Sequence, residues 1–154
     1  MSVDGSVRMG RWEIHSVPAG WWFVPDFGLR HQTDGDPPSN ITVSDDTLLA
    51  GNRLEPYIAT QVEILKGRFT APLFAGPQKS TLYPAEECML LMIRHPPRGD
   101  VRILQVQTYV RMERWLGIIT LTTKEQNLPG VRKDYEQFVS SLRVAAETTD
   151  GSHQ

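Results

Sequence analysis

The side chains that could support chemistry are few, and their spacing does not bring them together. His15, His31 and His95 fall in three different segments, and no two of them have the spacing of metal ligands. Cys88 lies inside the most apolar run of the chain, which is typical of a buried, unreactive thiol rather than a nucleophile. The sequence therefore predicts neither a metal site nor thiol chemistry.

The acidic residues give no stronger indication of catalysis. Four aspartates lie between residues 34 and 46, but they lack the ligand register of a Ca²⁺ loop, so we interpret them as turn and capping residues. Glu86 and Glu87 are adjacent, and neighbouring residues of a strand point to opposite faces. The sequence also lacks a Gly-rich phosphate loop, a Gly-x-Ser-x-Gly elbow and a His-Glu-x-x-His motif. We expect no catalytic residue and no cofactor, and hence a protein that is not an enzyme.

The elements that would have to position these residues belong to one domain of ordinary composition. The chain has 154 residues and a formal net charge of −2, which argues against a nucleic-acid binder that neutralises phosphates. A single cysteine gives no intrachain disulfide framework. There is no apolar leader at the start, and no apolar run near the roughly 20 residues that span a bilayer. We expect a cytoplasmic protein with no stable membrane insertion.

The two ends of the chain differ from its middle. Residues 1–9 and 145–154 are small and polar, so we predict flexible tails on either side of a domain spanning 10–144.

Apolar alternation and β-branched residues predict most of the secondary structure as strands. The segment 34–38 combines turn formers with two prolines and is predicted to be a loop, and the wider stretch 27–38 is polar and loop-like. The predicted strands are 11–17, the apolar segment 21–24, 40–44, 69–74, 80–83, 87–94, 101–111 and 115–122.

Two helices complete the prediction. The first begins near Asn52 as a cap, with Glu55 three residues on as in a capping box, and it stops at Gly67. The second follows residues 128–130 and carries an apolar stripe up to Leu142. This order predicts one α+β domain, a largely antiparallel twisted sheet with two main helices packed against it.

Two surfaces invite a binding interpretation. Trp21 and Trp22 could close the core or contact a partner, and the sequence leaves both open. Gln105 and Gln107 share a strand face with apolar residues, and Gln61 interrupts the apolar stripe of the first helix. Such a mixed surface suits a partner with apolar surface and exposed polar groups, although ordinary solvent-facing glutamines would give the same pattern.

Several pieces of the chain, in this order, resemble the DcrB-related family and, within it, the Eag chaperones that accompany type VI secretion effectors. They are Val-Pro-x-Gly-Trp at 17–21, Ser-Asn-Ile-Thr-Val-Ser-Asp-Asp at 39–46, Leu-x-x-Tyr-x-x-x-Gln-x-x-x-Leu at 54–65, Gln-Val-Gln-x-Tyr at 105–109, Ile-Thr-Leu-Thr at 119–122 and Phe-Val-Ser-Ser-Leu at 138–142.

This resemblance implies a PsbP-like fold and a function. Members of the chaperone branch act as homodimers that shield the N-terminal transmembrane-like helices of a toxin effector before export. Such helices need an apolar cover in water, and they accept hydrogen bonds from polar neighbours. A different protein-binding or scaffold module on the same fold is the alternative. The residues expected to contact the partner are Ile41, Val43, Gln61, Leu65, Val101, Ile103, Gln105 and Gln107.

Overall fold

The computed structural model describes residues 2–25, 27–32, 35, 38–48 and 52–145, with side chains from residue 7 onward. Its main feature is an antiparallel sheet of seven strands in the order β3-β4-β5-β9-β8-β7-β6. The strands are β3 (Trp21–Val24), β4 (Gly28–His31), β5 (Asn40–Thr47), β6 (Leu73–Lys79), β7 (Glu87–Arg94), β8 (Ile103–Arg111) and β9 (Trp115–Lys124).

A small second sheet corrects the prediction of a flexible N-terminal tail. Strand β1 (Ser2–Met9) pairs with β2 (Trp12–Ser16), and β2 also pairs with the short β10 (Arg143–Val144). Backbone pairing needs no apolar side chains, so the polar composition of the first residues did not reveal this strand. Of the predicted C-terminal tail only Ala145 is described; it is buried, and its N–H donates to the carbonyl of Arg11.

The two helices lie where the sequence predicts them, but the first is capped differently. Helix α1 (Leu54–Arg68) begins with Arg53 as N-cap, and no side chain of that residue caps it. Glu87 of β7 accepts the N–H of Leu54 instead, at 3.2 Å. The expected capping box of Asn52 and Glu55 is therefore wrong, and α1 continues one residue past Gly67.

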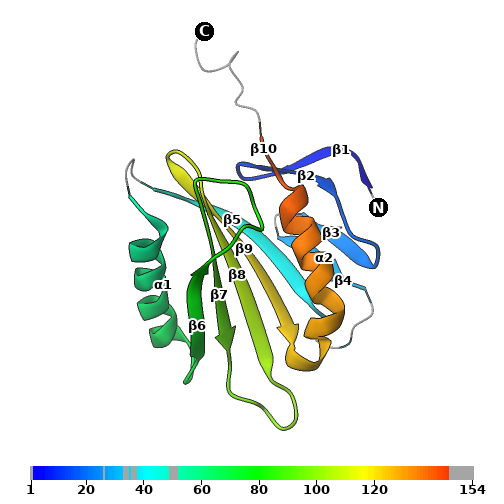
Figure 1. Ribbon diagram of the computed structural model, residues 1–154. Coiled ribbons are helices and arrows are strands. Elements are labelled where there is room, and N and C mark those ends of the chain that lie inside the picture. Colours follow the sequence, from blue (N-terminus) through cyan, green and yellow to red (C-terminus); the bar gives the residue numbers. More distant parts are fainter. Residues whose placement is uncertain (1, 26, 33–34, 36–37, 49–51, 146–154) are drawn as a thin grey trace.

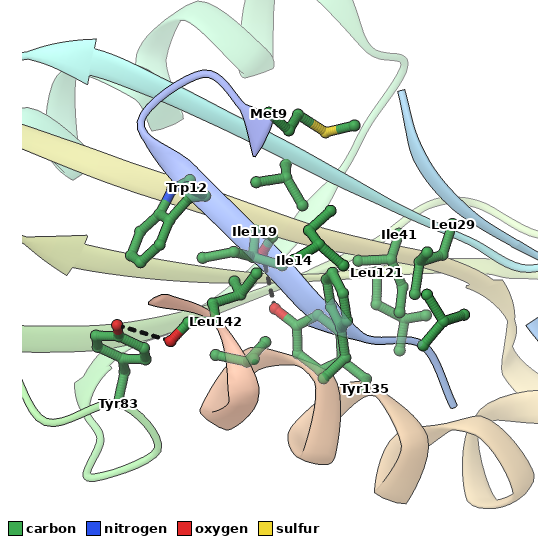
Figure 2. Packing of buried hydrophobic residues seen from close by; sticks show 14 of the residues in the cluster. Met9, Trp12, Ile14, Leu29, Ile41, Tyr83, Ile119, Leu121, Tyr135 and Leu142 are labelled. Carbon is green, nitrogen blue, oxygen red and sulfur yellow. Dashed lines mark hydrogen bonds between the residues drawn. The ribbon is translucent and has the colours of Figure 1, made fainter. Parts of the chain in front are cut away.

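Helix α2 (Leu128–Ser141) packs on one face of the large sheet together with β2 (Figure 1). The Tyr135 hydroxyl lies at the centre of this core, where it donates to the carbonyl oxygen of Ile119 at 2.7 Å (Figure 2). A second bond there joins the Tyr83 hydroxyl to the carbonyl of Leu142. This main core contains buried side chains from β2, β3, β4, β5, β9 and α2, including Trp12, Ile14, Trp21, Leu29, Ile41, Ile119, Leu121 and Phe138.

Helix α1 lies at the β6 end of the sheet and covers only part of the opposite face (Figure 1). Its buried residues Leu54 and Ile58 form a second, smaller core with side chains of β7, β8 and β9. The sheet contributes Met89, Leu91, Ile93, Tyr109 and Leu116 to this core.

Most strand predictions agree with the structure, but two strand predictions and one loop prediction do not. The predicted strand 87–94 coincides with β7, whereas 80–83 forms no strand, and the strand expected at 69–74 lies instead at Leu73–Lys79. That edge strand tolerates Gly76 and Pro77 because its pairing with β7 is irregular there. Residues 28–31, expected to be loop, form β4 because they pair on both sides with β3 and β5.

The fold class is the predicted one, a single α+β domain with two helices packed on antiparallel sheets, consistent with the PsbP-like fold. Within the part of the chain that the structure describes, no helix is long and apolar enough to cross a membrane.

Candidate functional site

One face of the large sheet remains partly uncovered beside α1. Strand pairing aligns Trp22, Arg30, Asn40, Thr122 and Gln105 in one row across β3, β4, β5, β9 and β8. Directly paired residues point to the same face of a sheet. Their neighbours along each strand lie in the main core under α2, so this row belongs to the opposite face.

The uncovered face is floored mainly by hydroxyl and amide side chains. A second row joins Thr42, Thr120 and Gln107, and a third joins Ser44 to Ile118. Thr120 is buried and Ser44 is exposed, so access to solvent differs along the floor.

Helix α1 forms one wall of this face. Tyr57, Gln61, Ile64 and Arg68 follow at the spacing of one helix stripe. The Tyr57 hydroxyl donates to Asp46 of β5 at 2.7 Å, so this stripe faces β5 across the sheet. Ile64 is 41% exposed and leaves an aliphatic side chain on that wall. We call the space between this stripe and the floor the open groove; its floor consists of Thr42, Ser44, Ile103, Gln105, Gln107, Ile118, Thr120 and Thr122.

The two glutamines of the floor are held in place by neighbouring side chains. Gln105 donates its amide N–H to the Thr122 hydroxyl at 3.3 Å, and its Oε1 accepts from His95 Nε2 at 3.0 Å. Gln107 accepts the Tyr109 hydroxyl at 2.6 Å. Among the described residues, no side chain or backbone group accepts from the amide nitrogen of Gln107. Gln107 therefore keeps donor capacity on the floor of the groove.

One end of the open groove is hollowed. There a cavity of about 710 Å³ lies between the end of α1 and the β7–β8 connection. His95 is fixed in it by its bond to Gln105 and by an edge-on contact with the Phe69 ring, with centroids 4.7 Å apart. The cavity also contains Arg68, Arg98, Val101, Ile103 and Thr122 in its lining.

The structure brings together six of the eight residues expected to contact a partner. Ile103, Gln105 and Gln107 lie on the floor, and Val101 lines the cavity together with Ile103 and Gln105. On α1, Gln61 belongs to the wall, while Leu65 is half-buried and packs on the second core.

The remaining two predicted residues, Ile41 and Val43, are not available to a partner. They pair with Leu121 and Ile119 and lie in the main core beneath α2, on the opposite side of the sheet. Ile41 is fully buried. Their alternation identified a strand face correctly, but it could not indicate which face of the sheet a helix covers.

The predicted contact set did not include the other groove residues, among them Ile64 on the wall and Thr42 and Thr120 on the floor. The two tryptophans have different environments. Trp21 is buried, and its indole N–H donates to the Asp134 carboxylate at 2.9 Å. Trp22 is 62% exposed and lies at the edge of the sheet face that carries the groove. Alternation along β3 was the signal that could have separated the two rings.

The residues considered for chemistry lie apart. Cys88 is buried, and burial raises the pKa of its thiol, as expected for an unreactive cysteine. His15 contacts Glu13 on the surface, and His31 packs edge-on against Trp21. No group of three or more His, Cys, Asp or Glu side chains within the described ranges could hold a metal ion.

Comparisons place this architecture in a known class of fold. No family model matches the sequence, and no curated protein matches it either. Among solved structures, the chain is similar to LpqN, a protein involved in cell envelope biogenesis of Mycobacterium tuberculosis, with 13% identity and a TM-score of 0.62 over 88% of this chain and 83% of LpqN.

A protein of unknown function from Pseudomonas aeruginosa, PA94, is also similar, with 16% identity and a TM-score of 0.58 over 94% of this chain and 98% of PA94. At these identities the two likenesses show a shared fold.

Proposed function

We propose that this domain is a non-catalytic binding protein whose open groove covers an apolar helical segment of a partner protein. The observation that carries the proposal is the uncovered sheet face beside α1, with the exposed Ile64 on its wall and Gln105 and Gln107 on its floor. Ile64 on the wall and the isoleucines of the floor supply apolar contact area, and the glutamines supply hydrogen-bonding groups to the same partner.

The dimensions of the open groove favour a helix as the occupant. Helix α1 has 15 residues, which corresponds to a wall of about 22 Å at the usual rise per residue. Strand β5 has 8 residues and runs about 26 Å along the floor. A partner helix of about 15 residues would lie along this length.

The sequence motifs narrow the partner further. The resemblance to the Eag chaperones supports a cytoplasmic adaptor, acting as a homodimer, that shields the N-terminal transmembrane-like helices of a type VI secretion effector. Such helices expose a large apolar surface in water before export, and a surface of mixed character would keep them from aggregating. The alternative is a protein-binding or scaffold module whose partner has no such helices.

Co-expression with the product of the neighbouring gene tests this proposal. If that product has an N-terminal pair of apolar helices, we expect it to remain in the supernatant and to co-purify only when this protein is present. Replacing Ile103 by Glu puts a charge on the apolar part of the floor and should weaken the complex by about tenfold or more.

Leu73→Glu is the matched control, because Leu73 is 60% exposed and lies outside the open groove, on edge strand β6. It should leave binding unchanged. The proposal is contradicted if the product precipitates regardless of this protein, or if Ile103→Glu and Leu73→Glu behave alike. Co-purification of a partner without apolar helices would favour the scaffold alternative.

A further inference from the structure

The cavity at one end of the open groove has a basic lining. Its described lining includes Arg68 at the end of α1, and His95 and Arg98 in the β7–β8 connection, and it includes no acidic residue. His95 is engaged by Gln105, so the two arginines supply the fixed positive charge. Arg30 lies on the same sheet face, in the row that contains Gln105.

These arginines differ from the basic residues nearby. Arg94 and Arg102 both contact Glu125, at 3.2 and 3.7 Å, so that part of the surface is neutralised. Arg68 and Arg98 are exposed and form no ion pair with any described residue. The cavity therefore presents two arginines that have no ion-pair partner among the described residues.

We infer that this end of the open groove binds an acidic segment that directly flanks the apolar helix of the partner. The inference rests on the proposed function, because it places that helix in the groove. A helix lying along the groove brings its flanking residues to Arg68 and Arg98. Exposed charge pairs there would add little affinity each, but they would fix which end of the partner helix lies at the cavity.

Three fluorescent peptides test the inference. Each contains the same apolar helical stretch of about 15 residues. The peptides differ only in the short run that follows this stretch at one end, which consists of Glu in the first peptide, Gln in the second and Lys in the third. We expect the Glu peptide to bind about tenfold more tightly than the Gln peptide in low salt, and the Lys peptide more weakly than both. The preference should shrink in 1 M salt, where the Debye length is about 3 Å.

A pair of charge reversals locates the effect. In the double variant Arg68→Glu with Arg98→Glu, the preference should disappear or turn towards the Lys peptide. The matched control is Arg114→Glu with Lys133→Glu, since both residues are exposed and lie outside the cavity lining. This control should retain the preference for Glu, and circular dichroism of both double variants checks that they are folded.

The outcomes separate the two proposals. Equal binding of the Glu, Gln and Lys peptides would contradict the inference that the cavity binds an acidic segment, but it would leave the proposal of a helix-binding groove in place. The same holds if the control reversals remove the preference as fully as the cavity reversals do. If none of the peptides binds, the proposed function itself is contradicted.

Discussion

At the scale of single residues, the hydroxyl group of Tyr135 makes two hydrogen bonds inside the main core. Its ring is buried, its hydroxyl lies 2.6 Å from the Thr108 hydroxyl, and it donates to the carbonyl of Ile119. Burial of both partners means that water cannot replace these bonds. Tyr135 therefore joins α2 to β8 and β9 through one atom.

Replacing Tyr135 by Phe should lower the free energy of unfolding by about 1–3 kcal/mol, because it leaves buried polar groups without their partner. Urea unfolding measures the change. Tyr57→Phe is the control, since it removes only an exposed hydrogen bond to Asp46 and should cost less than about 1 kcal/mol. Equal losses in the two variants would show that the buried network adds nothing.

Polar residues inside apolar patterns predicted the location of the groove better than the alternation of residues along the strands did. Glutamines inside apolar patterns identified Gln61, Gln105 and Gln107, which the structure places around the groove. Ile41 and Val43 were expected beside them but lie under α2. Alternation fixes which residues share a face, whereas the choice of face depends on where the chain places each helix, a long-range contact that local sequence does not encode.

At the scale of elements, the start of helix α1 depends on Glu87, a residue of strand β7. Glu87 accepts the Leu54 N–H with one oxygen and contacts Arg53 with the other, at 3.1 Å. It also lies 3.7 Å from Arg111, and its side chain is only 14% exposed. The cap therefore ties the helix to β7 rather than closing it locally.

Glu87→Ala should lower the free energy of unfolding by about 1–3 kcal/mol, because it removes the helix cap and a partner of a largely buried arginine. Asn52→Ala, which removes the cap expected from sequence, should change it by less than about 0.5 kcal/mol. Thermal or urea unfolding of the two variants compares them directly. A larger loss from Asn52→Ala would restore the local capping box.

Elements with a strong local pattern were predictable, and those defined by pairing were not. Strand β7 has a continuous apolar run, and α2 has a clear apolar stripe of buried residues. Strand β4 has four residues and exists because β3 and β5 flank it, and β6 contains a Gly-Pro step that favours a turn. Tertiary pairing outweighed local propensity at both places.

At the scale of the whole molecule, the burial of the tyrosines links folding to alkaline pH. The chain has four tyrosines, and burial is the main cause that raises the pKa of each above its ordinary value. For Tyr109, in the second core, the pKa rises to about 12. Tyr135, in the main core, shifts in the same direction. Both cores, on opposite faces of the sheet, are thus coupled to the same titration.

A pH titration tests this coupling. In the unfolded chain tyrosine loses its proton near pH 10, so between about pH 10 and 12 the unfolded state binds fewer protons than the folded state. The free energy of unfolding should therefore be intact below about pH 10 and fall as the pH rises towards 12. Tyrosinate absorbance, followed beside circular dichroism, should rise at a higher pH in the folded protein than in concentrated urea, where all four tyrosines should titrate near pH 10. Full ionisation near pH 10 with native circular dichroism would contradict the packing of both cores.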